Sequence, residues 1–310
     1  MRPIDVVAPN AKPGTQIWFR GKRIIDAVIQ TLAAEHGLSD ATVVLETGAS
    51  AGGLAAYLHA DYVHQKLRQV APGLATYASA PISGFFLDHP NVLGAPVYEV
   101  MMRHLYGISN ASSGVNPRCI AAHAPAEQWV CLFAANSYAH TDVPIFALNS
   151  AIDAWQTGCI YTATLDPGFP SSHHEGLEHA NCGNVGHAAG NPKTGPWTKC
   201  SGDLEECNAT QIGMMNRYID DFRAAMNTTA TFRKPGNGAF VHSCHTHCEA
   251  QTTPSWLHFK VGGVSIQESV SKWWRENLAS NFTTPATGNT YAPCSYRTST
   301  PHECNPTCQT

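Results

Sequence analysis

The stretch 42–54, TVVLETGASAGGL, decides the fold that the sequence predicts. A β-rich run ends at Gly48, and Ser50 stands between two alanines and is followed by two more glycines. A Gly-x-Ser-x-Gly segment is typical of a sharp turn from a strand into a helix, where only small flanking residues such as Gly48 and Gly52 avoid clashes. Residues 51–68 have helical spacing, so the context that this turn requires is present. We therefore predict a nucleophile at Ser50; the alternative is an ordinary small-residue turn.

Short apolar runs alternate with helical segments along the rest of the chain. Helical spacing occurs in residues 15–40, 51–68, 214–226 and 267–278, and strand-like runs occur in residues 42–47, 77–86 and 144–149. This alternation predicts an α/β layered fold. Residues 166–211 are rich in Gly, His, Asn, Pro and Cys, and we expect them to form long loops held by disulfides.

Composition excludes two classes of partner. Charged residues make up 14% of the 310 residues, the formal net charge is -4, and Lys and Arg do not cluster. A basic surface for nucleic acid is therefore not expected. No apolar run approaches the roughly 18 residues that a membrane-spanning helix needs. The sequence gives no indication of an oligomeric state.

Cysteines and glycosylation motifs favour a secreted, extracellular protein. Eleven cysteines lie between Cys119 and Cys308, several of them in polar loops, and the odd number leaves one without a partner. Disulfides persist in oxidising compartments. Four N-x-S/T motifs are candidates for glycosylation, at Asn110, Asn208, Asn227 and Asn281. The first residues contain no apolar stretch of the kind found in a signal peptide.

A serine nucleophile needs a base and an acid that orients the base. The segment NSAIDAWQ (149–156) directly follows the apolar run 144–148, so we expect Asp153 just past the carboxyl end of a strand, where functional groups gather in α/β sheets. The alternative for this aspartate is a helix N-cap. The base candidates are clustered histidines, His242, His245 and His247. The amide of Ala51 opens the helix after the serine and can point at a developing oxyanion.

A zinc site is the rival interpretation of the cluster formed by Cys244, His245, His247 and Cys248. Four ligands within five residues do not easily surround one tetrahedral ion, and an oxidising compartment favours disulfides. We therefore expect no metal and no other cofactor. Pairs such as Cys244 with Cys248, or Cys304 with Cys308, are possible, and more distant pairings are equally allowed.

Six segments of the sequence resemble the pectin acetylesterase family, which includes the animal Notum-type carboxylesterases. They are FRG (19–21) with Arg23 and Ile24, GASAGGLAA (48–56) with His59 and Asp61, SGFFLD (83–88), PIF (144–146) with NSAIDAWQ (149–156), SCHTHC (243–248) and CNPTC (304–308). The resemblance covers most of residues 17–308 in the right order. It implies an α/β-hydrolase-like fold with a mostly parallel sheet.

The resemblance also implies roles for individual residues. Ser50 is the nucleophile, Asp153 the orienting acid and His247 the base, while His245 occupies a variable position. Trp155 and Gln156 line or brace the substrate pocket. The implied reaction is removal of acetyl groups from pectin, a cell-wall polysaccharide, through an acyl-serine. The alternatives are a Notum-like lipid–protein carboxylesterase and a catalytically impaired secreted binding protein on the same scaffold.

The resemblance predicts that the chain is divided into three segments. Residues 1–16 are unlike the family and are expected to be an unrelated or non-native N-terminus, residues 17–282 the esterase domain, and residues 283–310 a Cys/Pro/Thr-rich tail. The family has a glycine-rich oxyanion loop upstream of the serine, and residues 1–16 contain none. We therefore expect an N-terminally truncated chain with weakened activity, because a lost oxyanion donor costs about 10²–10³ in rate.

Overall fold

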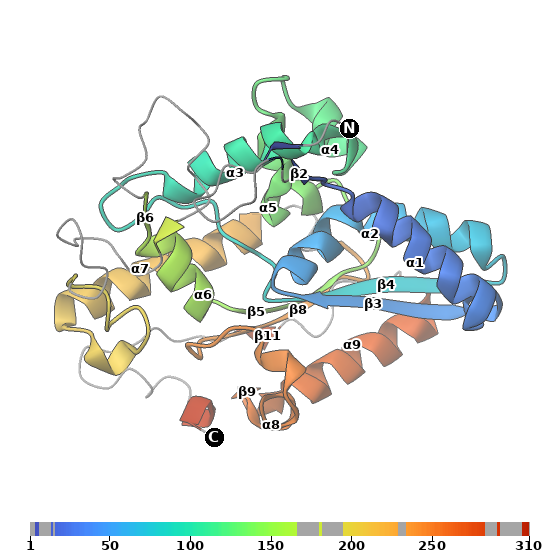
Figure 1. The fold of residues 1–310 in the computed structure, drawn as a ribbon. Helices are drawn as coiled ribbons and strands as arrows, with labels where there is room; N and C mark the ends of the chain where they lie inside the picture. The colour runs from blue at the N-terminus through green and yellow to red at the C-terminus, as the bar shows by residue number, and fades with distance from the viewer. Residues whose placement is uncertain are drawn as a thin grey trace.

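A parallel sheet of five strands, in the order β11-β8-β5-β4-β3, forms the centre of the fold (Figure 1). The computed structural model describes residues 4–5, 14, 16–165, 180–181, 195–228, 234–282, 290–291 and 306–309. The strands are β3 (Val43–Ala49), β4 (Thr76–Ile82), β5 (Phe146–Ser150), β8 (Gly238–His242) and β11 (Thr290–Tyr291). Every neighbouring pair is parallel, from Val43 opposite Thr76 to Ser150 opposite His242. The α/β fold with a parallel sheet is confirmed.

Helices cover both faces of the sheet. The helix α2 packs on β3 and β4 with α1 outside it, and α9 packs on the opposite face (Figure 1). The α-helices are α1 (Gly21–Glu35), α2 (Ala51–Val70), α3 (Val97–Ser109), α4 (Pro117–Ala122), α5 (Ala134–Tyr138), α6 (Ala154–Gln156), α7 (Ala209–Thr228), α8 (Thr253–His258) and α9 (Ile266–Ser280). In the described part of the chain, no helix is long and apolar enough to cross a membrane.

Short elements complete the described structure. Antiparallel two-stranded pairs are formed by β1 (Ile4–Asp5) with β2 (Gln16–Ile17), β6 (Thr164–Leu165) with β7 (Ala180–Asn181), and β9 (Lys260–Val261) with β10 (Val264–Ser265). Single helical turns are η1 (Leu38–Asp40), η2 (Ala111–Ser113), η3 (Gln128–Leu132), η4 (Thr157–Tyr161), η6 (Leu204–Glu206), η8 (Glu249–Gln251) and η9 (Pro306–Gln309).

The central strands are buried on both faces, as expected for a parallel sheet with helices on either side. Phe146 and Leu148 of β5 pack in one core with Trp273 of α9, whereas Ala147 packs in another core with Phe222 of α7. Because successive side chains of a strand point to opposite faces, one five-residue strand supplies both cores. This packing fixes where β5 ends, and hence the position of the residues that follow it.

The expected elements are present, with shifted ends. The helix expected over 15–40 is α1 and begins only at Gly21. The strand expected over 77–86 ends at Ile82, because Ser83 has a positive φ of 47°. The loop expected to run to residue 211 is shorter, because α7 begins at Ala209. Asn208 N–H donates to Gln211 Oε1 (2.9 Å), and Gln211 N–H donates to Asn208 Oδ1 (3.0 Å). This reciprocal pair is a capping box that was not predicted from the sequence.

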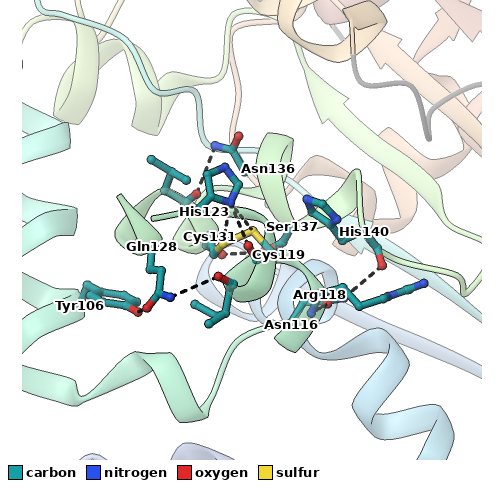
Figure 2. The surroundings of a disulfide bond; sticks show 12 residues. Tyr106, Asn116, Arg118, Cys119, His123, Gln128, Cys131, Asn136, Ser137 and His140 are labelled. Atoms are coloured by element: carbon teal, nitrogen blue, oxygen red, sulfur yellow. Dashed lines mark hydrogen bonds between the residues drawn. A yellow bond between two sulfur atoms is a disulfide. The ribbon is translucent and has the colours of Figure 1, made fainter. Parts of the chain in front are cut away.

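Three disulfides join described cysteines: Cys119–Cys131, Cys200–Cys207 and Cys244–Cys308. Figure 2 shows the first, which joins α4 to η3 alongside a hydrogen bond of 3.2 Å from Gln128 Nε2 to the carbonyl of Ile120. The Cys244–Cys308 bond means that neither short-range pairing considered from the sequence is formed. It also contradicts the rival zinc site, since a disulfide sulfur is not a thiolate ligand. The histidine-rich part of the expected loop, 172–187, lies outside the described residues except for 180–181.

Candidate active site

Ser50 lies in a sharp turn between β3 and α2. Its backbone angles are φ 56° and ψ -123°, a conformation that residues other than glycine rarely adopt. The turn is held by two backbone hydrogen bonds of 2.9 Å, from Ser50 N–H to the carbonyl of Ile82 and from Leu54 N–H to the carbonyl of Ser50. The strained turn therefore raises the Ser50 hydroxyl at the carboxyl end of the parallel strands, as the Gly-x-Ser-x-Gly pattern predicts.

Glycines allow the turn because backbone segments touch there. A Cβ atom on Gly48 would lie 2.4 Å from the carbonyl oxygen of Gly52, and one on Gly53 would lie 2.4 Å from the carbonyl oxygen of Ile82. A Cβ atom on Gly84 would lie 2.2 Å from the carbonyl carbon of Gly53. The expectation that Gly52 must be small is wrong, since a Cβ there meets nothing within 4 Å. The required glycine is the next one, because the first turn of α2 rests directly on the chain after β4.

We expect Gly53→Ala to lower the free energy of unfolding by about 1–3 kcal/mol, the usual range for overpacking. The added methyl group meets backbone atoms, which cannot rotate away. Gly52→Ala is the matched control, and it should leave stability unchanged or raise it, because alanine favours helix more than glycine does. Chemical denaturation of both variants measures the difference. Equal stabilities would mean that the contact between α2 and β4 relaxes freely.

Three side chains from distant parts of the sequence form one hydrogen-bonded chain. His247 Nε2 lies 2.8 Å from Ser50 Oγ, and His247 Nδ1 lies 2.7 Å from Asp153 Oδ2. Asp153 is fully buried, and the His247 side chain is 21% exposed. This is the nucleophile–base–acid geometry that acyl transfer requires.

Asp153 has two structural roles at once. It follows β5 by three residues, and its Oδ1 accepts a hydrogen bond of 3.0 Å from the Gln156 amide at the start of α6. Its other oxygen accepts from His247. The two interpretations considered from the sequence, helix N-cap and partner of a histidine, are therefore compatible.

The segment after β8 brings His247 to the serine. Two hydrogen bonds hold its backbone at the carboxyl ends of β5 and β4. Ala154 N–H donates to the carbonyl of Thr246 (3.1 Å), and Cys248 N–H donates to Ser83 Oγ (3.0 Å). The Cys244–Cys308 disulfide anchors the same segment from the other side. His247 is thus fixed by contacts before and after it in the sequence.

Burial and charge set the protonation of this chain. Burial raises the pKa of Asp153, and the hydrogen bond from His247 works against that rise. Burial opposes the charged form of His247, but the hydrogen bond and negative charge of Asp153 outweigh it and raise the pKa of the imidazole above its ordinary value. Cys248 is the free cysteine among those described, and burial with two nearby carboxylates raises the pKa of its thiol to about 11. Cys248 is therefore a neutral thiol at pH 7, and it does not compete with Ser50 as a nucleophile.

The other expected site residues occupy different positions. The ring of Trp155 lies beside the imidazole, with centroids 6.4 Å apart, and it packs edge-on against Phe86 at 5.0 Å. Gln156 is fully buried, and its Oε1 accepts from the Leu87 amide (2.9 Å) and from the Tyr218 hydroxyl (3.1 Å). Trp155 thus lies against the imidazole and Phe86, and Gln156 holds the chain that follows β4.

Ala51 and His245 are also placed by the structure. Ala51 is the first residue of α2, and the first amides of a helix have no partner within it. Its N–H therefore has no partner within α2 and follows Ser50 directly in the chain. His245 Nε2 lies 2.9 Å from Thr157 Oγ1, so the structure gives this histidine a hydrogen-bonded position of its own.

The four candidate glycosylation sites lie on the surface. They are the exposed residues Asn110, Asn208, Asn227 and Asn281. Asn110 and Asn281 end α3 and α9 in the left-handed conformation, and the side chain of Asn208 caps α7. Exposure meets the steric requirement for a glycan at each position.

Comparison with known proteins identifies the family. A sequence model described as pectinacetylesterase matches residues 6–185 and 179–309. The chain belongs to the pectinacetylesterase family. The matches together cover nearly the whole chain, including Ser50, Asp153 and His247.

Curated relatives of this chain come from a plant and an animal. Pectin acetylesterase 5 of Arabidopsis thaliana is 28% identical over 269 residues, which is 85% of this chain and 54% of the plant protein. Palmitoleoyl-protein carboxylesterase notum1 of Xenopus laevis is 26% identical over 303 residues, 94% of this chain and 51% of the frog protein. This chain therefore spans about half the length of these curated relatives.

A solved structure supports the fold of this family member. The Wnt deacylase Notum from Drosophila superposes with a TM-score of 0.63 at 17% identity, covering 98% of this chain and 69% of that one. The α/β-hydrolase-like fold expected from the sequence is confirmed by this similarity.

Proposed function

We propose that this pectinacetylesterase-family chain hydrolyses acetyl esters of pectin through an acyl-serine intermediate. The observation that carries the proposal is the hydrogen-bonded chain from Ser50 through His247 to Asp153. The family and the names of the plant relatives support the substrate class. No cofactor is part of the proposal.

Each side chain has a defined task in this proposal. Ser50 Oγ attacks the ester carbonyl while His247 Nε2 takes its proton, and Asp153 holds the imidazole and stabilises its charged form. His247 then gives the proton to the leaving alcohol and activates water for deacylation. The amide of Ala51 donates to the oxyanion, and Trp155 and Gln156 shape and brace the pocket.

Acetate release from acetylated pectin tests this function. The protein should release acetate, and a fluorophosphonate probe should label Ser50. Absence of both from a folded chain that still binds pectin would favour the alternative, a secreted binding protein on the same scaffold.

A second candidate is hydrolysis of a lipid ester on a protein. The aromatic rings of Phe86 and Trp155 beside His247 offer an apolar surface, and the name of the frog relative describes this activity. The two candidates differ in acyl length. A higher kcat/KM for p-nitrophenyl octanoate than for p-nitrophenyl acetate, without acetate release from pectin, would favour the lipid ester.

The cellular context and the division of the chain belong to the same proposal. Three disulfides and four exposed N-x-S/T motifs support a secreted glycoprotein. Action on the cell wall follows from the pectin substrate proposed above. Residues 17–282 would be the esterase domain and residues 283–310 a tail. The family match begins at residue 6, so residues 6–16 belong with the family and not to the unrelated segment expected from the sequence.

The pH dependence of kcat/KM should have an acid limb above pH 6.5. His247 acts as a base only when neutral, and Asp153 raises its pKa above the ordinary value of 6.5. The active fraction therefore falls as pH drops through this raised value. Initial rates with p-nitrophenyl acetate between pH 5 and 9 measure the limb. A rate that stays constant from pH 9 down to pH 5 would contradict the role of His247 as base.

A further inference from the structure

A second buried histidine–carboxylate pair lies next to the segment that carries His247. His242, the last residue of β8, has its Nε2 2.6 Å from Oε1 of Glu249. The two side chains are 0% and 1% exposed. The mechanism proposed above does not use either residue. A buried carboxylate is costly unless it is fully hydrogen-bonded, so this pair requires an explanation.

Hydrogen bonds fix the charge of the pair. Cys244 N–H donates to His242 Nδ1 (3.1 Å), so this nitrogen carries no proton and Nε2–H donates to Glu249. The other carboxylate oxygen, Oε2, accepts from Ser83 Oγ at 3.3 Å. Burial opposes ionisation of Glu249, whereas the hydrogen bonds that its carboxylate accepts from His242 and Ser83 favour the charged form. The His242–Glu249 pair therefore holds one negative charge next to the segment 243–249, which carries His247.

Ser83 connects this carboxylate to both ends of the candidate active site. It is fully buried and directly follows Ile82, whose carbonyl accepts the Ser50 amide. Because the Ser83 proton goes to Glu249, the Ser83 oxygen is free to accept the Cys248 amide at 3.0 Å. Ser83 thus links the two parts of the site: its neighbour Ile82 is hydrogen-bonded to Ser50, and its own hydroxyl is hydrogen-bonded to Cys248, the residue after His247.

We propose that Glu249 is a positioning residue for His247, which holds the imidazole against Ser50 and stabilises its charged form. The proposal rests on the proposed function. Glu249 acts in two ways. Its hydrogen bonds to His242 and Ser83 hold both ends of the segment 243–249 in place. Its negative charge, together with that of Asp153, stabilises the charged form of the His247 imidazole. The ionisable groups that face the imidazole or this carboxylate are His242 from β8, Asp153 after β5 and Cys248 on the same segment. Tyr218 of α7 faces Asp153.

Glu249→Gln removes the charge and keeps the shape. We expect it to lower kcat about tenfold, the smaller end of the effect of losing an outer partner of a functional histidine, with KM changed less than about twofold. The acid limb of the pH profile should move down by about half a unit, because a nearby negative charge favours the imidazolium. The matched control is Glu46→Gln on β3, a half-buried glutamate that bonds to Tyr77 and does not contact this segment. It should leave the acid limb in place.

A titration of His247 by NMR measures the same shift without any substrate. The imidazole should titrate about half a unit lower in Glu249→Gln than in the parent or in Glu46→Gln. Unchanged titration together with an unchanged kcat would overturn the proposal. A parent protein that neither hydrolyses esters nor labels at Ser50 would refute the proposed function, while the titration would still decide the role of Glu249.

Two further variants decide the question if Glu249→Gln does not fold. Glu249→Asp and Ser83→Ala both keep a negative charge, but each breaks the link between the carboxylate and the Cys248 amide. Both should lower kcat while the acid limb stays in place. If both variants kept the parent kcat, Glu249 would have only a structural role.

Discussion

Replacing Ser50 with alanine should lower kcat for p-nitrophenyl acetate by about 10⁵–10⁶-fold, as loss of the nucleophile does in serine hydrolases. The hydroxyl is the only group of the hydrogen-bonded chain that forms the acyl intermediate, and the His247–Asp153 pair cannot replace it. Steady-state kinetics and fluorophosphonate labelling measure the loss. Alanine also fits the small space of the turn, so the thermal midpoint should stay close to that of the parent.

Ser271→Ala, on α9 and far from this site in the sequence, is the control for the loss of a serine. It should keep the parent rate and the label. If Ser50→Ala still hydrolysed the ester at a rate near that of the parent, another nucleophile would be at work. The neutral thiol of Cys248, whose pKa is raised to about 11, is a poor candidate for that role.

Asp153→Asn should lower kcat by about 10⁴-fold with little loss of stability. An asparagine can turn its N–H toward His247 Nδ1, which moves the imidazole proton to Nε2. A protonated Nε2 cannot accept the proton of Ser50, although all three side chains stay in place. Rates measured between pH 6 and 10 test this expectation. The asparagine oxygen can still cap α6, so the loss is chemical rather than structural.

Asp203→Asn provides the matched control. Asp203 also caps a helical turn, through a hydrogen bond of 2.9 Å from the Glu205 amide to its Oδ1, but among the described residues it has no histidine partner. It should change kcat by less than about twofold, since surface substitutions away from the site have small effects. A fall of less than tenfold in Asp153→Asn would mean that Asp153 serves mainly as a helix cap.

Local sequence features predict the elements around the nucleophile. The apolar run before Gly48 and the helical spacing after Ser50 predict β3 and α2, and both are present. The position of Asp153 follows from an apolar strand that ends just before it. The choice of His247 among sixteen histidines came from the family resemblance alone, since composition and spacing favoured none of them.

Other features depend on contacts between distant segments and were not predictable from local sequence. Gly53 must be small only because the chain after β4 presses on α2. The His242–Glu249 pair forms because the segment after β8 turns back, and Ser83, 166 residues earlier, completes it. By contrast, β8 could have been predicted from local sequence, because the apolar run GAFVH (238–242) follows the turn residues Pro235 and Gly236.

The disulfide between Cys244 and Cys308 sets an order of events during synthesis. The two cysteines are 64 residues apart, so the ribosome must add all of these residues before the bond can form. Until then, the segment that bears His247 lacks its covalent anchor on a growing chain. Maturation of the site therefore waits for translation to pass Cys308 and for an oxidant to reach the finished segment.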